Sequence, residues 1–239
     1  MPAETVDVMT LPLGDEHVEV SLLDVTRMAE TDATATRFLT LRERAEYARL
    51  RHPGRRREWL GARVCLKTML LRNRSVGDPT ECEIMKDARG RPWLSFAPGL
   101  PGRKVYDCSL SHKGRFASAC ASAMADRAVG VDVEEISPRL LRLAGAFVGD
   151  RATFFRSRPP EERLALLWAL KEARAKAVGG GIGTAMQSVT CEETAVGRHR
   201  ITAGDGLQLR ARHLVYEGYI IAVCVNDKRR DCDNAKTAC

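Results

Sequence analysis

The 239-residue chain has few aromatic residues and lacks several patterns that assign a function at once. Aromatic residues make up 5% of it, and it contains no RRM, KH or zinc-finger pattern, so the usual features of nucleic-acid-binding modules are missing. No apolar run approaches the roughly 18 residues that span a membrane. The start, MPAETVDVMT, lacks the basic and then apolar order of a secretory signal. We therefore expect a soluble, cytoplasmic protein with neither membrane nor nucleic acid as partner.

The eight cysteines include no CxxC pair. Most stand singly in apolar runs such as ARVCLKTML and IIAVCV, where cysteine packs as a small hydrophobic residue. Cys108 and His112 could begin a zinc site, but no second pair of ligands follows at zinc-site spacing. The sequence favours reduced thiols over disulfides or zinc.

What the chain does have is enough apolar sequence for a core and an excess of positive charge. Hydrophobic residues make up 44% of it, which suits one large domain or two small ones packed together. The net charge of +7 favours an acidic partner, such as a phosphorylated small molecule, an acidic protein or nucleic acid. Charge alone does not choose between these three.

The pattern of apolar residues predicts an α+β fold. Residues 40–73 have helical patterning that is interrupted at Pro53-Gly54, and residues 83–125 alternate short β-like runs with turns. AVGVDVEEI predicts a strand, Leu164–Val178 a helix, and SVTCEE, LQLRARHL and GYIIAVCV the closing strands. Each half is expected to run helix first and then strands. We predict two pseudo-symmetric lobes, residues 1–125 and 126–227, each a small antiparallel sheet packed with helices, and a polar, disordered tail over 228–239.

The stretch VGVDVEE places acids in an apolar strand. Alternation puts Asp132 and Glu134 on one face and Val131 and Val133 on the other. Two neighbouring carboxylates repel each other, and a hard divalent cation such as Mg²⁺ resolves the conflict through oxygen ligands. The alternative is an edge strand whose acids face solvent or pair with arginines.

The helix WALKEARAKAV carries a third carboxylate, Glu172. Glu172 lies four residues from both Trp168 and Lys176, and Lys171 lies three from Trp168, so one helix surface is expected to carry an aromatic ring, a carboxylate and two cations. Glu172 could complete a metal site with the strand acids, while the lysines hold phosphate oxygens. The alternative is a solvated face of glutamate and lysine anchored by Trp168.

Two further stretches suit anions. SLSHKGRF, residues 109–116, offers hydroxyl, imidazole and ammonium groups in a turn, which can donate to phosphate. Ser111 and His112 point opposite ways on a strand, so they do not suggest a serine hydrolase. RHPGRRRE, residues 51–58, is either a site for a terminal phosphate or a solvated basic face. The glycine run 179–183 follows a helix instead of a strand and breaks the GxGxxG spacing, so it predicts a helix stop and a loop.

The chain resembles the 4′-phosphopantetheinyl transferases of the surfactin-synthetase activating type in four motifs that occur in the same order. These motifs are GRP (90–92), SLSHKGR (109–115), VGVDVEE (129–135) and WALKEARAKAVGGGI (168–182). Members of this family transfer the phosphopantetheine arm of coenzyme A to a serine of an acyl or peptidyl carrier protein. They release 3′,5′-ADP and hold Mg²⁺ at the pyrophosphate. The resemblance implies this activity, coenzyme A as co-substrate and an acidic carrier protein as partner, in polyketide or nonribosomal peptide biosynthesis among other pathways. It is also consistent with a monomer.

The resemblance also implies roles for individual residues. The implied metal ligands are Asp132, Glu134 and Glu172, and Glu172 would also take the serine proton, with Lys171 and Asp132 in the catalytic set. The implied coenzyme contacts are Arg56, Arg63, Arg91, Ser111, His112, Lys171 and Lys176. Arg91 stands where many members have Lys, and Lys113 where many have a small polar residue. The arginine that aligns with the family's phosphate ligand is not determined among Arg55, Arg56 and Arg57.

Two alternative functions and the role of one segment stay open from the sequence. A metal-dependent phosphohydrolase of coenzyme A or a nucleotide would share the metal site but use water as nucleophile. A nucleic-acid-binding protein would use the basic cluster at 51–57 without a need for Mg²⁺. The segment Leu140–Phe155 is apolar and either docks the carrier protein or belongs to the core.

Overall fold

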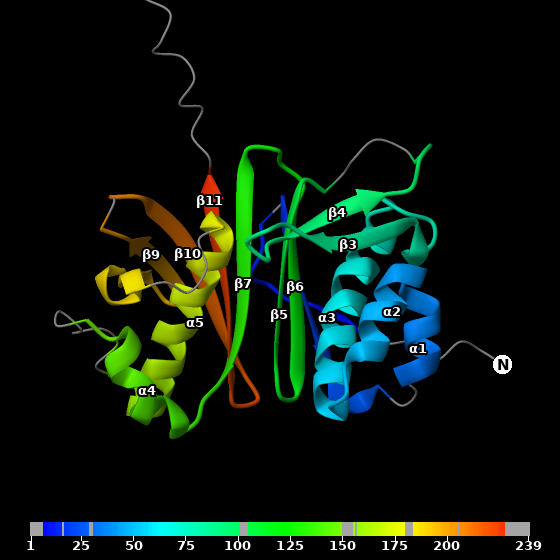
Figure 1. Cartoon of the computed structure of the whole chain (residues 1–239). Helices are drawn as coiled ribbons and strands as arrows, with labels where there is room; N and C mark the ends of the chain where they lie inside the picture. The colour runs from blue at the N-terminus through cyan, green and yellow to red at the C-terminus, as the bar shows by residue number, and fades with distance from the viewer. Residues whose placement is uncertain are drawn as a thin grey trace, which may run out of the picture.

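The computed structural model describes residues 7–15, 17–28, 31–100, 105–149, 155, 157–179, 184–204 and 206–227. Within these ranges the chain has an α+β fold with antiparallel sheets and helices, as predicted (Figure 1). The predicted tail over 228–239 and most of the glycine run, residues 180–183, lie outside the described residues. In the described part of the chain, no helix combines the length and the apolar character that a membrane crossing requires.

The first half contains two helices where the sequence predicts them. A reciprocal capping box of Thr40 and Glu43 begins one, and Pro53 begins the other in the first helical turn, where its missing N–H costs nothing. The elements of this half are β1 (Met9–Thr10), β2 (Val18–Asp24), η1 (Val25–Arg27), α1 (Thr31–Phe38), α2 (Leu41–Arg49), α3 (Pro53–Arg72), η2 (Pro79–Glu81), β3 (Cys82–Lys86), β4 (Pro92–Phe96), β5 (Asp107–Lys113) and β6 (Phe116–Ser122). They form a four-stranded sheet in the order β1-β2-β6-β5 and a separate β3-β4 hairpin.

The second half forms one five-stranded sheet in the order β7-β11-β10-β9-β8. Its elements are β7 (Arg127–Glu135), α4 (Arg139–Phe147), α5 (Pro160–Val178), η3 (Thr184–Ser188), β8 (Thr190–Ala195), β9 (Arg198–Thr202), β10 (Gln208–Tyr216) and β11 (Tyr219–Asp227). Helix α5 begins at Pro160, four residues before the predicted Leu164, and ends at Val178 as predicted, where Gly179 with a φ of 73° forms the left-handed cap.

The predicted order of helix and then strands is wrong for both halves. Each half begins with strands: β2 precedes the helices of the first, and β7 precedes those of the second. Strand β2 is an inner strand that is buried on both faces, and its nearly continuous apolar sequence, VEVSLLD, lacks the alternation that marks a half-exposed strand. The predicted boundary near residue 125 falls in the connection between β6 and β7.

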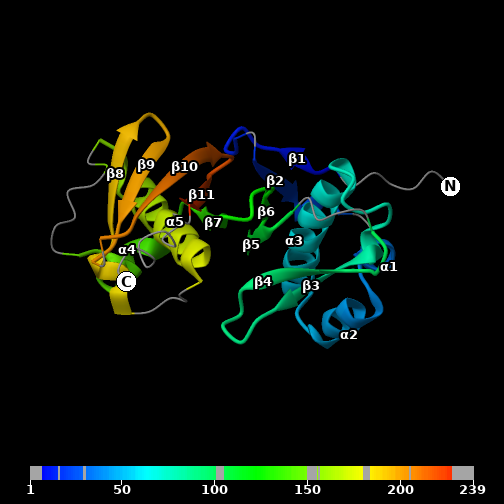
Figure 2. The same cartoon turned by 90° about the horizontal axis from the view of Figure 1, so that it is seen from above.

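The two sheets pack face to face, with α3 on the outer side of the first and α5 on the outer side of the second (Figure 2). Val129, Val131 and Val133 of β7 belong to the apolar core between the sheets, so the alternate residues of β7 face α5. At Gly130 a Cβ would lie 2.0 Å from the carbonyl oxygen of Ala173, so the absence of a side chain allows α5 to approach the strand closely.

Candidate functional site

Strands β5 and β7 meet along a seam made by side chains of β5. Asp107 Oδ2, Ser109 Oγ and Ser111 Oγ accept hydrogen bonds from the backbone N–H groups of Val129, Val131 and Val133, at 2.7, 3.1 and 3.2 Å. The acceptors are every second residue of β5 and the donors every second residue of β7, so side chains on one face of β5 meet backbone groups on one edge of β7. The seam satisfies donors on the edge of β7 that does not pair with β11 and fixes β5 beside the acids of β7.

Asp132 and Glu134 lie on the α5 side of β7, as the alternation predicts, and each holds a lysine. Asp132 Oδ1 accepts from Lys176 Nζ at 2.7 Å and from Ser111 Oγ at 2.9 Å. Glu134 Oε1 lies 2.8 Å from Lys113 Nζ. Both carboxylates are 6% exposed, and burial is the main cause that raises the pKa of Glu134.

Glu172 of α5 joins this pair as a third buried carboxylate. Burial first, and then the negative charge of Asp132, raises its pKa to about 7. Oε1 of Glu172 and Oδ2 of Asp132 are both buried and have no hydrogen-bond partner. Buried polar atoms are rarely left unsatisfied in a folded protein, so these two oxygens are candidates to hold a ligand.

The three carboxylates offer only oxygen atoms, which suits Mg²⁺ better than a softer metal. In the described part of the chain, the ligand atoms of Glu193, His199 and His213 lie within 4.8 Å of one another, and the three carboxylates are spread more widely. Their donor chemistry and the two unpartnered oxygens fit a hard divalent cation.

His112 lies at the edge of the same region, on the opposite face of β5 from Ser111. Its Nδ1 is 3.2 Å from Glu58 Oε2 and 3.3 Å from Arg55 Nη1, so α3 holds the imidazole. Burial and the neighbouring Arg55 charge lower its pKa to about 4. Glu58 also accepts from the N–H of Gly114 and so fixes the turn after β5.

Arg91 connects the β3-β4 hairpin to both β5 and α5. Its guanidinium donates to the carbonyls of Lys176 and Ala177 at 2.7 and 3.1 Å, and to Asp107 Oδ2 at 2.6 Å. The cation therefore closes the C-terminal end of α5, where free carbonyls and the helix dipole favour positive charge.

Three of the predicted site residues are not brought to the carboxylates. Lys171 Nζ is buried and donates to the carbonyls of Phe147 and Met186, at 2.7 and 2.5 Å. Arg63 is 3% exposed and stacks over the Trp59 ring, one turn earlier on α3. The guanidinium of Arg56 lies over the ring of Tyr47 and pairs with Asp32.

Four residues hold the site together through contacts that the sequence did not predict, although Ser109 and Lys113 belong to the stretch predicted to bind phosphate. Asp107 and Ser109 form the seam with β7, Lys113 pairs with Glu134, and Glu58 holds His112. Asp107, Ser109 and Ser111 alternate with Cys108 and Leu110 along β5. This alternation predicts that the three polar side chains share one face of the strand.

Residues 128–224 match the 4′-phosphopantetheinyl transferase superfamily. This segment carries Asp132, Glu134 and Glu172. This match supports the predicted resemblance at the level of the superfamily over these residues. Membership of the surfactin-synthetase activating type stays a prediction.

Two curated relatives carry related names. A phosphopantetheinyl transferase of Thraustochytrium sp. is 29% identical over 198 residues, which cover 74% of this chain and 66% of the relative. The 4′-phosphopantetheinyl transferase psf-1 of Bacillus pumilus is 30% identical over 123 residues, which cover 50% of this chain and 49% of the relative. The chain thus spans just under two thirds and about half of the lengths of these relatives.

Two solved structures align with less than half of the chain. The holo-[acyl-carrier-protein] synthase of Thermotoga maritima has a TM-score of 0.36 and 27% identity, over 43% of this chain and 64% of its own. A holo-(acyl-carrier-protein) synthase of Bacillus anthracis in complex with CoA (3′,5′-ADP) has a TM-score of 0.37 and 22% identity, over 44% of this chain and 92% of its own.

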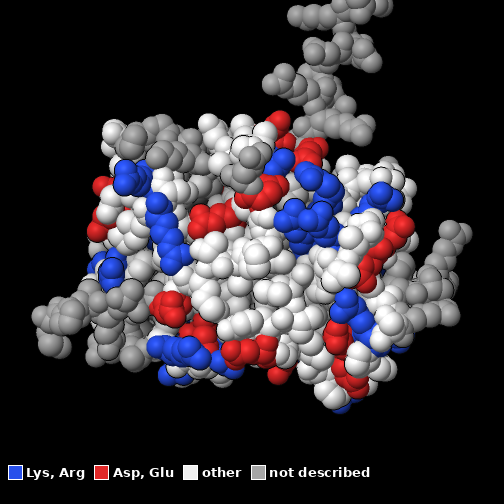
Figure 3. Space-filling view, turned by 180° about the vertical axis from the view of Figure 1, so that it is seen from behind, with Lys and Arg blue, Asp and Glu red and all other residues white. Residues whose placement is uncertain are grey.

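The surface charge in Figure 3 is mixed, with lysines and arginines interspersed with acids around a broad uncharged area. The basic groups on this face do not form one continuous surface of the kind that tracks a nucleic-acid backbone. A cavity of about 240 Å³ is lined by Arg198, Arg210 and Arg212 among others, but none of the three carboxylates lines it.

Proposed function

We propose that this protein transfers the 4′-phosphopantetheine group of coenzyme A to a serine of an acyl or peptidyl carrier protein and releases 3′,5′-ADP. The observation that carries the proposal is the buried carboxylate set within the segment that matches the superfamily. Asp132 and Glu172 keep unpartnered oxygens there, next to the ammonium groups of Lys113 and Lys176. The curated names of the two relatives support the same activity.

Asp132, Glu134 and Glu172 are the residues that would hold Mg²⁺. Their oxygen donors and the two unpartnered atoms fit this ion. When bound, Mg²⁺ supplies positive charge that offsets the negative charge on the pyrophosphate oxygens.

The lysines and the seam residues bind and orient the coenzyme in this proposal. Lys113 and Lys176 are each 29% exposed, so their ammonium groups can turn toward phosphate oxygens of an incoming ligand. Ser111 and His112 contribute donors for phosphate at the end of β5. Arg91 positions the nucleotide end of the coenzyme indirectly, because it donates hydrogen bonds to the C-terminal turn of α5.

The transfer forms a bond between the serine oxygen and the β-phosphorus as the bond to the 3′,5′-ADP leaving group breaks. The serine proton passes to Glu172, directly or through a water molecule. The protein mainly positions the groups and neutralises charge, because phosphoryl transfer asks for little covalent chemistry from the enzyme. Lys171 acts from a distance: it ties α5 to the carbonyls of Phe147 and Met186.

The remaining parts of the proposal concern organisation and partner. Residues 1–125 and 126–227 form the two lobes, and one chain supplies every residue of the carboxylate site, so a monomer suffices. The positive net charge favours an acidic carrier. For docking we favour the surface of α4, where Leu141 and Leu143 are exposed.

The test is the intact mass of an apo carrier protein after incubation with this protein, coenzyme A and Mg²⁺. We expect a gain of one phosphopantetheine group on the carrier serine, lost in Glu134→Gln. Glu135→Gln is the matched control, because Glu135 is the next residue on β7 but is exposed on the other face. Free phosphopantetheine without carrier modification would instead favour a phosphohydrolase, and no reaction with several unrelated carriers would overturn the transferase.

A further inference from the structure

A second cluster of potential metal ligands lies on the C-terminal sheet, on strands other than those of the carboxylate site. Glu193 is on β8, His199 on β9 and His213 on β10. In the described part of the chain, these are the residues whose ligand atoms come within 4.8 Å of one another. The proposed transfer reaction gives none of them a role.

The strand register explains why the three side chains meet. Glu193 pairs with His199 across β8 and β9, and the N–H of His213 donates to the carbonyl of Gly197 just before β9. Side chains that alternate along neighbouring strands share one face. Cys191, Ile201 and Leu209 occupy the same face one step further along and pack in the core beneath α5. The cluster is therefore the polar continuation of a buried apolar row.

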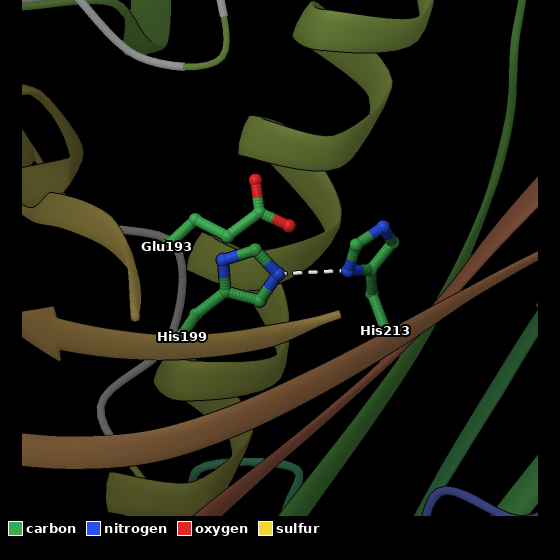
Figure 4. Close-up of side chains that lie close together, drawn as sticks. All are labelled: Glu193, His199 and His213. Carbon is green, nitrogen blue, oxygen red and sulfur yellow. Dashed lines mark hydrogen bonds between the residues drawn. The ribbon is translucent and has the colours of Figure 1, made fainter. Parts of the chain in front are cut away.

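The side chains of Glu193, His199 and His213 converge on a common point. His199 Nε2 and His213 Nδ1 are 2.7 Å apart, and the Glu193 carboxylate points toward the space between the two rings (Figure 4). The Phe155 ring packs edge-on against His199 at 5.4 Å and limits the movement of that imidazole. Glu193 is exposed, so a dissolved ion can reach the cluster from its side.

The charges around the two imidazoles sum to a negative value. Burial is the main cause that lowers the pKa of both imidazoles, which favours the neutral form of each ring. Around them, the cation Arg158 is paired with both Glu162 and Glu193. One positive and two negative charges leave a net charge of −1 beside two neutral imidazoles.

We propose that Glu193, His199 and His213 bind one late first-row divalent cation, with Zn²⁺ as the representative. Two imidazoles and a carboxylate, with a fourth position open to water, are a common zinc ligand set. At metal–nitrogen distances of about 2.0–2.1 Å, tetrahedral coordination separates the two nitrogens by about 3.3 Å. When the ion binds, the two ring nitrogens must therefore move apart by a fraction of an ångström from their present distance of 2.7 Å.

Binding also requires a shift of one proton that the structure can accommodate. The present contact between the two rings needs one of its nitrogens to carry a proton, whereas a metal needs a lone pair on both. His199 Nδ1 is buried and has no hydrogen-bond partner, so it is a vacant position for that proton within the same ring. No oxidant or further reactant is involved. The bound ion would join β8, β9 and β10 at their outer corner.

The test is the titration of the full-length, chelator-treated protein with Zn²⁺ and, in parallel, with Co²⁺. With saturating Mg²⁺ present to occupy the transferase carboxylates, we expect one equivalent to bind and the affinity to fall by at least about tenfold in His199→Gln, His213→Gln and Glu193→Gln, as each removes one of three ligands. Glu192→Gln is the matched control, because Glu192 is exposed on the opposite face of β8 and pairs with Arg200. Asp132→Asn should bind as the unmodified protein does, which separates this site from the transferase carboxylates.

Two readouts keep the test independent of folding and of the cysteines. Glu193 is exposed, so Glu193→Gln remains decisive if a histidine variant fails to fold. Bound Co²⁺ should show the absorption of a nitrogen and oxygen ligand set without a thiolate charge-transfer band. Cys191 of the same sheet is buried with its pKa raised to about 12, so its thiol stays protonated. A thiolate band, or equal affinity in the Glu193→Gln and Glu192→Gln variants, would overturn the site.

Discussion

The ammonium of Lys176 lies 2.7 Å from Oδ1 of Asp132, and it also donates to Ser111 Oγ and to the carbonyl of Val131. One lysine therefore joins α5, β7 and β5 at the point where the two sheets meet. Beside this pair, Glu172 has no compensating hydrogen bond on Oε1. With all three acids ionised, the two lysines leave the site with a net charge of −1, which favours the addition of a cation.

The first prediction concerns Mg²⁺ and needs no transferase assay. Saturating Mg²⁺ should stabilise the protein by about 2 to 3 kcal/mol at a hundredfold excess over its dissociation constant. Asp132→Asn should reduce this gain, because it removes one of the carboxylate ligands. Thermal unfolding with and without Mg²⁺ measures the difference. Glu135→Gln should keep the full gain, and an equal gain in both variants would show that the ion binds elsewhere.

The second prediction concerns the contact between α5 and β7. Gly130→Ala should destabilise the protein by about 2 kcal/mol or more, because the new Cβ would lie 2.0 Å from the backbone oxygen of Ala173 and a helix backbone cannot turn aside. Gly145→Ala in α4 is the control, since a Cβ there meets nothing within 4 Å. That change should stabilise by up to about 1 kcal/mol through helix propensity. Urea unfolding of the two variants measures both effects, and similar stabilities would refute the close contact.

The third prediction concerns Arg91. Arg91→Lys keeps the charge but cannot reach two carbonyls of α5 and the Asp107 carboxylate at once, so we expect a loss of about 1 to 3 kcal/mol in the free energy of unfolding. Arg89→Lys, two residues earlier and exposed, should change it by less than about 0.5 kcal/mol. Denaturant unfolding compares the two, and equal stability would mean that the bridge contributes nothing.

The positions of the three carboxylates follow from local patterns in the sequence, and their role as metal ligands stays a prediction. Alternation in β7 fixes the face of Asp132 and Glu134, and the apolar pattern of α5 identifies a helix that packs on a sheet. Most strand positions were predicted for the same reason. Strand β2 was missed because its burial on both faces removes the alternation.

The rest depended on contacts between distant segments. Adjacent residues on a helix point about 100° apart, so Lys171 faces Phe147 and Met186 while Glu172 faces β7. Arg63 pairs with Glu43, twenty positions earlier, through the packing of α2 on α3. The approach of His199 and His213 likewise follows from strand register, which spacing along the chain does not reveal.

The fourth prediction concerns the pH dependence of stability. His112 has its pKa lowered to about 4 by burial and by the charge of Arg55, with Lys176 acting in the same direction and Glu58 opposing. An unfolded chain binds a proton on this imidazole below its ordinary value of 6.5, whereas the folded chain does so only near pH 4. The contribution of His112 is therefore fully present above pH 6.5 and is lost as the pH falls toward 4. We expect it to amount to about 3 kcal/mol.

A comparison of His112→Gln with the unmodified protein isolates this contribution, because His199 and His213 have pKa values shifted the same way and remain in both. The free energy of unfolding in urea, measured from neutral pH down to pH 4, should fall less steeply in the variant. The two curves should differ in slope only between the unfolded and folded pKa values, since outside that window both states bind the same number of protons on the imidazole. Parallel curves through this window would show that the folded protein protonates His112 as readily as the unfolded chain, and that burial and Arg55 do not outweigh Glu58.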